Sequence, residues 1–137
     1  IEASARFGFS LHMGIPEGSE PDPAFVDWAT KNGGEINISR DPVEAVSGAD
    51  LVVTDTWVSM NQEHRARGHN VFFPYQVNEE LMEHADKDAL FMHCLPAHRG
   101  EEVTDAVIDG PQSVVFDEAE NRLHAQKGIL AWCFDAL

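Results

Sequence analysis

The stretch DPVEAVSGADLVVTD, residues 41–55, joins the pattern of a short helix directly to the pattern of a strand. Asp41 and Pro42 are typical of the cap and first position of a helix, and Gly48 is typical of its end. Ala49–Asp55 is a short apolar run, as expected for a strand that is covered on both faces. A helix that leads straight into such a strand indicates an α/β protein with a parallel sheet.

The same alternation of strand and helix continues on both sides of this stretch. The further predicted strands are Phe9–Ile15, Glu35–Ser39, Ala89–Leu95 and Ser113–Phe116. The further predicted helices are Asp22–Gly34, with Gly33 or Gly34 as its end, Gln76–Ala85, Glu101–Pro111 and Asp117–Leu137. This alternation predicts a three-layer αβα fold in which helices cover both faces of a mainly parallel sheet.

The composition limits the size of the protein and the class of its partners. With 137 residues and 43% hydrophobic content, the chain is expected to form one domain, residues 1–137, with its own core. Its net charge of −15 argues against nucleic acid or an anionic membrane surface as a partner, because both bind clustered cations. Two cysteines, without a signal sequence or a transmembrane run, predict a cytoplasmic protein. The opening IEASARFGF is typical of the second half of a helix that ends at Gly8, so we expect a first strand upstream of this chain.

Three polar segments follow predicted strands and are therefore candidates for a ligand site. In an open parallel sheet, ligands bind beyond the carboxyl ends of the strands. These ends are followed by TWVSMNQEHR after Asp55, by PAHRG after Leu95 and by DEAENR after Phe116. In the predicted sheet all three segments lie along one edge, where they can contact one ligand.

Asp55 and the residues after it offer polar groups at this edge. A carboxylate at the end of an apolar strand either caps the next helix or binds an ammonium group. The Ser59 hydroxyl can hydrogen-bond a carboxylate or an amine, and Met60 can offer its backbone. Trp57 is expected to pack rather than to act on a ligand. The segment therefore predicts either a helix cap or an ammonium site.

The stretch FMHCLPAHRG places His93, Cys94 and His98 close together, which raises three alternatives: core residues, a metal site, or a nucleophile with its base. Neighbouring residues on a strand point to opposite faces, so His93 and Cys94 do not easily bind one ion. A covalent role for Cys94 with His98 lacks a nucleophile elbow or a glycine-rich turn. We therefore expect no metal and give the covalent role little weight.

A backbone carbonyl and a guanidinium are the other candidate groups. Pro96 is expected to hold Leu95 extended with its carbonyl outward, and a Cys94 thiol near cations is expected to be partly ionised. Arg122 forms either a surface ion pair with Glu118, four residues earlier, or a contact to a phosphate or a carbonyl oxygen. Because no glycine-rich nucleotide motif is present, we expect no cofactor.

Three segments together resemble the ornithine carbamoyltransferases: TDTWVSM, MHCLPAHRGEEVTDAVIDGP and SVVFDEAENRLHAQKGIL. IEASARFGF and PEGSEPDP match as well, so the resemblance covers essentially the whole chain. It is to the second, ornithine-binding domain of these enzymes, which has a Rossmann-like fold. The resemblance implies transfer of a carbamoyl group from carbamoyl phosphate to the δ-amine of L-ornithine, giving citrulline and phosphate.

The resemblance also implies roles for individual residues. It implies that ornithine is bound by Asp55 through the α-ammonium, by Ser59 and by the Met60 backbone. It implies that carbamoyl phosphate is bound by Cys94, by the Leu95 carbonyl, which accepts a hydrogen bond from the carbamoyl NH2, and by Arg122. Cys94 would lie between the substrates as a proton acceptor or as a group that positions ornithine, and His93 would support the loop.

Two departures from the family pattern affect these expectations. Asn61 stands where the family usually has glycine, although asparagine is the commonest substitute for glycine at positive φ. The family's carbamoyl-phosphate domain, with its Ser-Thr-Arg-Thr loop, is not part of this chain. We therefore expect the chain alone to be inactive and the full-length protein to be a homotrimer. The alternatives are a non-catalytic amino-acid-binding or scaffold domain, and a carbamoyltransferase for another amine such as putrescine, which Asp55 disfavours.

Overall fold

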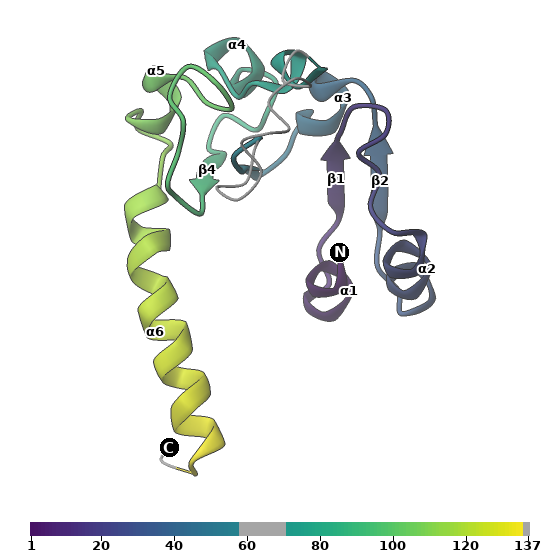
Figure 1. Ribbon diagram of the computed structural model, residues 1–137, viewed down its shortest axis with the longest axis vertical. Helices are drawn as coiled ribbons and strands as arrows, with labels where there is room; N and C mark the ends of the chain where they lie inside the picture. Colours follow the sequence, from purple (N-terminus) through teal and green to yellow (C-terminus); the bar gives the residue numbers. More distant parts are fainter. Residues whose placement is uncertain (58–70, 136–137) are drawn as a thin grey trace, which may run out of the picture.

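The computed structural model describes residues 1–57 and 71–135, and its strands and helices alternate along the chain (Figure 1). The strands are β1 (Leu11–Gly14), β2 (Ile36–Ser39), β3 (Leu51–Thr54) and β4 (Leu90–His93). The helices are α1 (Glu2–Phe7), α2 (Pro23–Lys31), α3 (Pro42–Val46), α4 (Glu79–Met82), α5 (Asp105–Ile108) and α6 (Val115–Cys133), with the 3-10 helix η2 (Phe73–Tyr75) before α4. The predicted alternation is confirmed, with shorter elements than the sequence patterns suggested.

Helices α2 and α3 begin at the predicted caps, and the first three helices end at the predicted glycines. The carboxylates of Asp22 and Asp41 each accept a hydrogen bond of 2.9 Å from a backbone N–H two residues on, at the starts of α2 and α3. Gly8, Gly33 and Gly48 lie just beyond the three helices with φ of 73°, 84° and 66°. Glycine adopts this left-handed conformation without the steric cost of a Cβ atom, so these positions stop the helices.

The four strands pair in parallel, as predicted, but in two separate pairs. Leu11 of β1 lies opposite Ile36 of β2, and Leu51 of β3 lies opposite Leu90 of β4. Within residues 1–57 and 71–135, β1 and β3 share no ladder, so the sheet is not continuous. A cavity of about 800 Å³ lies between the two pairs and reaches Trp57, next to the end of β3. Helix α3 packs against β1, β2 and α4 and so joins the first pair to the second, while α1 and α2 lie at the opposite end of the first pair (Figure 1).

The hydrophobic core surrounds β3 and β4, and α4, α5 and the start of α6 contribute to it. Its buried members are Val52, Val77, Leu81, Met82, Phe91, Val103, Val107, Ile108 and Val115. Phe91 and Val103 are fully excluded from solvent. This packing fixes the carboxyl ends of β3 and β4 side by side, which is where the candidate site lies.

The predicted strand Ser113–Phe116 is wrong. Ser113 makes a single parallel bridge to Phe91, and α6 then begins at Val115, two residues before the predicted helix start at Asp117. The Val114 N–H donates to the Phe91 carbonyl at 3.0 Å, which ties the start of α6 to β4. Of this short apolar run, Val115 is the residue that is buried in the core. A short apolar run fits the start of a buried helix as well as a short strand, so its pattern alone does not decide between them.

The position of Val115 at the start of α6 has a testable consequence for stability. Val115 is 1% exposed and Phe116 is 73% exposed. Val115→Ala is expected to lower the free energy of unfolding by about 2 kcal/mol, because it removes buried methyl groups and leaves a cavity. Phe116→Ala, the larger truncation, is expected to change it by less than about 0.5 kcal/mol. Urea unfolding of both variants checks this, and equal losses would contradict the burial of Val115 against the core.

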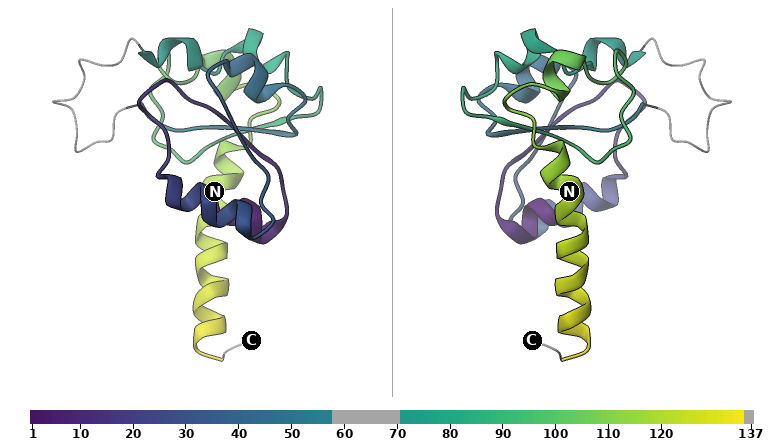
Figure 2. Two further views of the ribbon diagram at one scale, coloured as in Figure 1. Left: turned by 90° about the vertical axis from the view of Figure 1, so that its right-hand side faces the viewer. Right: turned by 90° about the vertical axis from the view of Figure 1, so that its left-hand side faces the viewer.

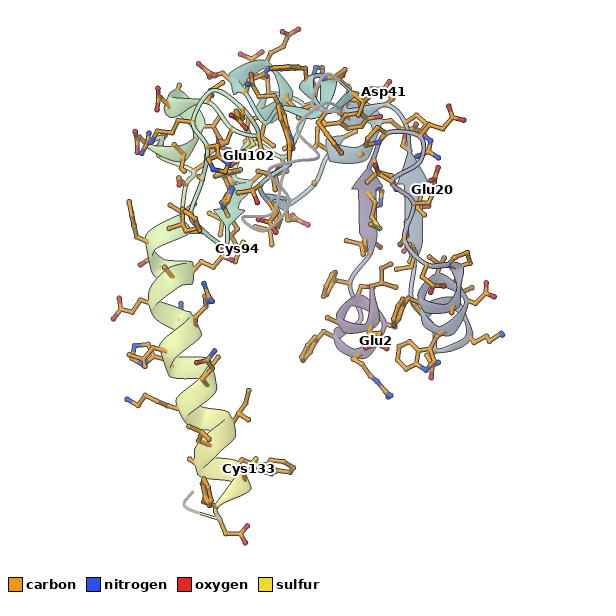
Figure 3. All side chains as sticks on the ribbon, viewed as in Figure 1. Glu2, Glu20, Asp41, Cys94, Glu102 and Cys133 are labelled. Carbon is orange, nitrogen blue, oxygen red and sulfur yellow. The ribbon has the colours of Figure 1, made fainter. Side chains whose placement is uncertain are left out.

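Most of α6 projects away from the rest of the chain (Figure 2). Cys94 lies near the start of α6, and Cys133 lies near the far end of that helix (Figure 3). Exposed apolar side chains on this length are Leu123, Ile129, Leu130, Trp132 and Phe134. No helix among the described residues has the length and apolarity to cross a membrane.

Candidate functional site at the ends of β3 and β4

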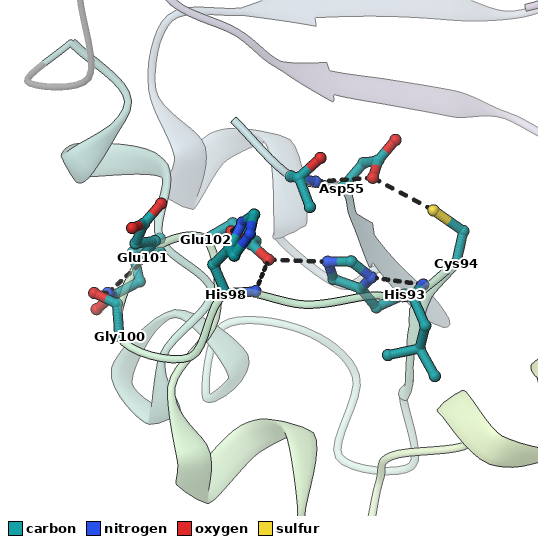
Figure 4. Close-up of polar contacts among 10 residues, drawn as sticks. Asp55, His93, Cys94, His98, Gly100, Glu101 and Glu102 are labelled. Atoms are coloured by element: carbon teal, nitrogen blue, oxygen red, sulfur yellow. Dashed lines mark hydrogen bonds and ion pairs between the residues drawn. The ribbon is translucent and has the colours of Figure 1, made fainter. Parts of the chain in front are cut away.

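Asp55 and Cys94 meet at the carboxyl edge of the second strand pair. Thr54 and His93 are register partners at the ends of parallel β3 and β4, so the next residue of each strand emerges at the same edge. The Cys94 Sγ donates a hydrogen bond to Asp55 Oδ1 at 3.2 Å, and the Thr56 N–H donates to the same oxygen at 2.7 Å (Figure 4). The structure therefore brings together the first two segments that the sequence placed at this edge.

The two groups shift each other's ionisation in opposite directions. Partial burial raises the pKa of the Asp55 carboxyl, but hydrogen bonds from the Thr56 N–H and the Cys94 thiol outweigh it and hold that pKa below its usual value. Partial burial raises the pKa of the Cys94 thiol, and the hydrogen bond to Asp55 and its negative charge raise it further. The expectation of a partly ionised Cys94 is wrong, because the group that touches the thiol is a carboxylate and not a cation.

This pair predicts how Cys94 reacts with an alkylating reagent. In a Cys133→Ser background, Cys94 is expected to react with iodoacetamide more slowly near pH 8 than an ordinary thiol, because little thiolate is present. Asp55→Asn removes the negative charge and is expected to move the pH profile of the reaction to lower pH. Alkylation rates measured from pH 7 to 10 check this, with Asp50→Asn as the control at the exposed start of the same strand. An unchanged profile in Asp55→Asn would contradict the assignment.

His93 is fully buried and held at both ring nitrogens. The Leu95 N–H donates to Nδ1 at 2.9 Å, so Nδ1 is the acceptor and the proton lies on Nε2. Nε2 then donates to Glu102 Oε1 at 3.0 Å, and the His98 N–H donates to the same oxygen at 2.6 Å. Glu102 is also fully buried, and the sequence analysis missed it. The only signal was the glutamate pair Glu101 and Glu102 in HRGEEV, and nothing in that sequence shows which of the two is fully buried.

Leu95 has a conformation that the sequence analysis did not predict. Its φ is 55°, in the left-handed region, and its peptide bond to Pro96 is cis. The expectation of an extended Leu95 is therefore wrong. The left-handed turn directs the Leu95 N–H back to the His93 ring, and the resulting hydrogen bond helps to hold a backbone that a non-glycine residue seldom adopts.

Arg122 reaches the same edge from α6. Its Nη1 donates to the Cys94 carbonyl oxygen at 3.2 Å. The alternative that the sequence left open, an ion pair with Glu118, does not form among the described residues. The third predicted segment therefore joins the other two, and the site contains a thiol, a carboxylate and a guanidinium.

His98 and Arg99, which the sequence left without a role, hold the loop after β4. Arg99 donates to both carboxylate oxygens of Asp109, at 2.5 and 2.9 Å, and to Asp105 at 2.7 Å. Asp105 is the first residue of α5 and Asp109 follows its last, so the guanidinium joins the loop to that helix. The hydrogen bonds from Asp109 and Asp105 raise the pKa of Arg99. His98 Nδ1 lies 3.8 Å from Glu102 Oε2.

Known proteins share this arrangement of elements and sequence. The aspartate/ornithine carbamoyltransferase family, in its Asp/Orn binding domain, matches residues 1–133. The chain belongs to this family. It is 72% identical over all 137 residues to "Ornithine carbamoyltransferase" from Agrobacterium fabrum and to that from Rhizobium meliloti, and it spans 45% of the length of each.

Solved structures of this family confirm the fold class. The anabolic ornithine carbamoyltransferase of Campylobacter jejuni superposes with a TM-score of 0.89 at 35% identity, over 96% of this chain and 45% of that one. The enzyme from Pyrococcus furiosus superposes with a TM-score of 0.77 at 56% identity, over 85% of this chain and 39% of that one. The predicted αβα, Rossmann-like transcarbamoylase domain is therefore confirmed.

Some expected family contacts lie outside the described residues. Ser59, Met60 and Asn61 belong to residues 58–70, which the structure does not describe. Trp57, just before them, stacks on Phe72 with ring centroids 6.1 Å apart and packs edge-on to Phe73 at 5.2 Å. Its expected packing role is therefore confirmed.

The ligand atoms of Asp55, His93 and Cys94 lie within 4.8 Å of one another, so the sequence argument that His93 and Cys94 must point apart is too simple. Both nitrogens of His93 are nevertheless engaged, by the Leu95 N–H and by Glu102. Metal binding by this family member at these residues would require one of those hydrogen bonds to break.

Proposed function

We propose that this chain supplies the ornithine half-site of a carbamoyltransferase. The full-length protein transfers a carbamoyl group from carbamoyl phosphate to the δ-amine of L-ornithine, and it releases citrulline and phosphate. The observation that carries the proposal is the Asp55–Cys94 contact at the shared edge of β3 and β4, with Arg122 on the Cys94 carbonyl. Membership of the aspartate/ornithine carbamoyltransferase family supports the same reaction.

Asp55 binds the α-ammonium of ornithine in this proposal. Its pKa lies below the usual value, so it is an anion at neutral pH and can accept hydrogen bonds from a protonated amine. In this proposal Ser59 and the Met60 backbone, which lie outside the described residues, complete the contact. Cys94 positions ornithine rather than accepting its proton, because its thiol already donates to Asp55 and its raised pKa disfavours the thiolate.

Carbamoyl phosphate binds beside Cys94, at the Leu95 carbonyl and Arg122. The carbamoyl NH2 donates to the Leu95 carbonyl, and the Arg122 guanidinium faces the phosphate or the carbonyl oxygen. The δ-amine attacks the carbonyl carbon: a C–N bond forms, the C–O bond to phosphate breaks, and phosphate leaves with the electron pair. The departing phosphate takes up the proton that the nitrogen loses. Negative charge develops on the carbonyl oxygen during this step, so a fixed guanidinium at the site lowers the barrier.

The rest of the loop keeps these groups in place. His93 supports Cys94 and Leu95 through its hydrogen bonds to the Leu95 N–H and to Glu102. Neither His93 nor Glu102 needs to touch a substrate in order to hold the loop. Positioning of this kind matters because misplacement of reacting groups by about 1 Å lowers rates strongly.

The half-site is expected to work only within the longer protein. The chain spans 45% of the length of its curated relatives, and a separate carbamoyl-phosphate domain completes the site in this proposal. The full-length protein is a cytoplasmic homotrimer in the same proposal. The 137-residue chain alone is expected to form no citrulline above background, and the full-length protein is expected to form it readily.

A citrulline assay on both proteins, with ornithine and putrescine as separate substrates, tests this function. Turnover by the full-length protein with ornithine, and much less with putrescine, supports it. Normal turnover by the isolated chain would contradict the half-site. A full-length protein that binds ornithine without turnover would instead indicate an amino-acid-binding domain.

A further inference from the structure

Glu118 lies in the first turn of α6, on the side of the helix that meets β4. Helix α6 packs against β4, and its start is fixed by the hydrogen bond from the Val114 N–H to the Phe91 carbonyl. Glu118 and Arg122 are four residues apart and so lie on one face of the helix. Because Arg122 reaches the Cys94 carbonyl, that face is directed at the carboxyl end of β4.

The Glu118 carboxylate has a buried oxygen without a partner in the described part of the chain. Its Oε2 is buried and has no hydrogen-bond partner among the described residues. The cation that helical spacing would offer it, Arg122, is bound to the Cys94 carbonyl instead. A buried carboxylate oxygen without a partner is costly, so its presence beside a candidate active site calls for an explanation.

The titratable and charged groups around Cys94 come from three elements. Asp55, after β3, accepts its hydrogen bond, and His93 precedes it on β4. Glu118 and Arg122 come from α6, and the charge of Glu118 acts on the thiol in the same direction as that of Asp55. The thiol is therefore subject to two carboxylates, of which only Asp55 touches it.

We propose that Glu118 is a positioning residue of the amine site: its unpaired carboxylate places negative charge beside Cys94 and thereby favours a substrate that brings a protonated amine to the thiol. This inference rests on the proposed function, in which that amine belongs to ornithine. Glu118 needs no contact with the substrate, because a charge in a partly desolvated site acts over several ångströms.

A purely structural alternative exists and makes a different prediction. An acidic residue in the first turn of a helix is favourable in itself, because it interacts with the positive end of the helix dipole. In that case Glu118→Gln would lower helix stability a little and leave the chemistry of Cys94 unchanged.

The test measures Cys94 directly in the 137-residue chain. In a Cys133→Ser background, the rate of iodoacetamide alkylation is measured against pH for Glu118→Gln and Glu118→Asp. Glu120→Gln on the same helix is the matched control, because Glu120 is 72% exposed and pairs with His124. Glu118→Gln is expected to move the profile about half a pH unit lower, the size of one partly screened charge. Glu118→Asp and Glu120→Gln are expected to leave it close to the parent profile, and circular dichroism reports whether each variant is folded.

Steady-state kinetics of the full-length protein complete the test. Glu118→Gln is expected to raise KM for ornithine about fivefold and to leave KM for carbamoyl phosphate unchanged. Coincident alkylation profiles for Glu118→Gln and the parent would overturn the proposal, and so would an unchanged KM for ornithine. Absence of citrulline formation by the parent enzyme would refute the proposed function, while the alkylation comparison would still decide whether Glu118 acts on Cys94.

Discussion

Asp55→Asn in the full-length protein is expected to lower kcat/KM for ornithine about 100-fold, the cost of a lost charge-assisted hydrogen bond to an ammonium group. The change keeps the shape of the side chain and still allows Oδ1 to accept from the Thr56 N–H, so the loop should keep its position. KM for carbamoyl phosphate is expected to change little, because in the proposed function that substrate binds on the side of Cys94 and Arg122. Initial rates with each substrate varied in turn give the two parameters.

Asp50→Asn provides the control for this variant. Asp50 lies just before β3, is exposed and contributes only its backbone carbonyl to pairing with β4. Asp50→Asn should leave kcat/KM for ornithine and KM for carbamoyl phosphate unchanged. A fall in kcat/KM of less than about threefold in Asp55→Asn would mean that the carboxylate only organises the turn after β3, the helix-cap type of role that the sequence also allowed.

Glu102→Ala is expected to lower the free energy of unfolding by about 3 kcal/mol, the largest effect on stability that we predict for a single residue of this chain. The truncation leaves the Nε2–H of His93 and the N–H of His98 without their acceptor. His93 is fully buried, so its N–H finds no water in compensation. The His93 ring then loses one of the two contacts that fix it beside Cys94.

Two comparisons sharpen this prediction. Glu102→Gln keeps an oxygen that accepts both hydrogen bonds and should cost clearly less than alanine. Glu101→Ala alters the neighbouring, less buried glutamate and is expected to cost less than about 0.5 kcal/mol. Urea unfolding of the three variants measures the differences. Equal losses in Glu102→Ala and Glu101→Ala would show that the buried hydrogen bonds contribute nothing to stability.

Local signals in the sequence predicted the caps of α2 and α3, the glycines that end the first three helices and the parallel direction of the strands, but not their division into two pairs. The caps at Asp22 and Asp41 and the left-handed glycines depend on residues within one turn, so the sequence contains the whole cause. The edge where Asp55 and Cys94 meet was also predictable, because parallel strands end on the same side of a sheet. Arg122 reaches this edge from α6 and not from the end of a strand. The strand proposed at Ser113–Phe116 failed because its apolar run fits a short strand and the start of a buried helix equally well.

The sequence by itself determined the α/β class, the family motifs and the residue types available at the site. Only the tertiary structure decided the partner of each carboxylate. Asp55 accepts a hydrogen bond from the Cys94 thiol, and Glu102 accepts one from the buried His93. Glu118 pairs with no cation among the described residues. The tertiary structure also decided that Arg122 donates a hydrogen bond to the Cys94 carbonyl and does not pair with Glu118. The physical reason is distance along the chain. Caps and turns form between near neighbours, so the local sequence determines them. The burial and charge of the site depend on the packing of β3, β4 and α6, which are far apart in the sequence.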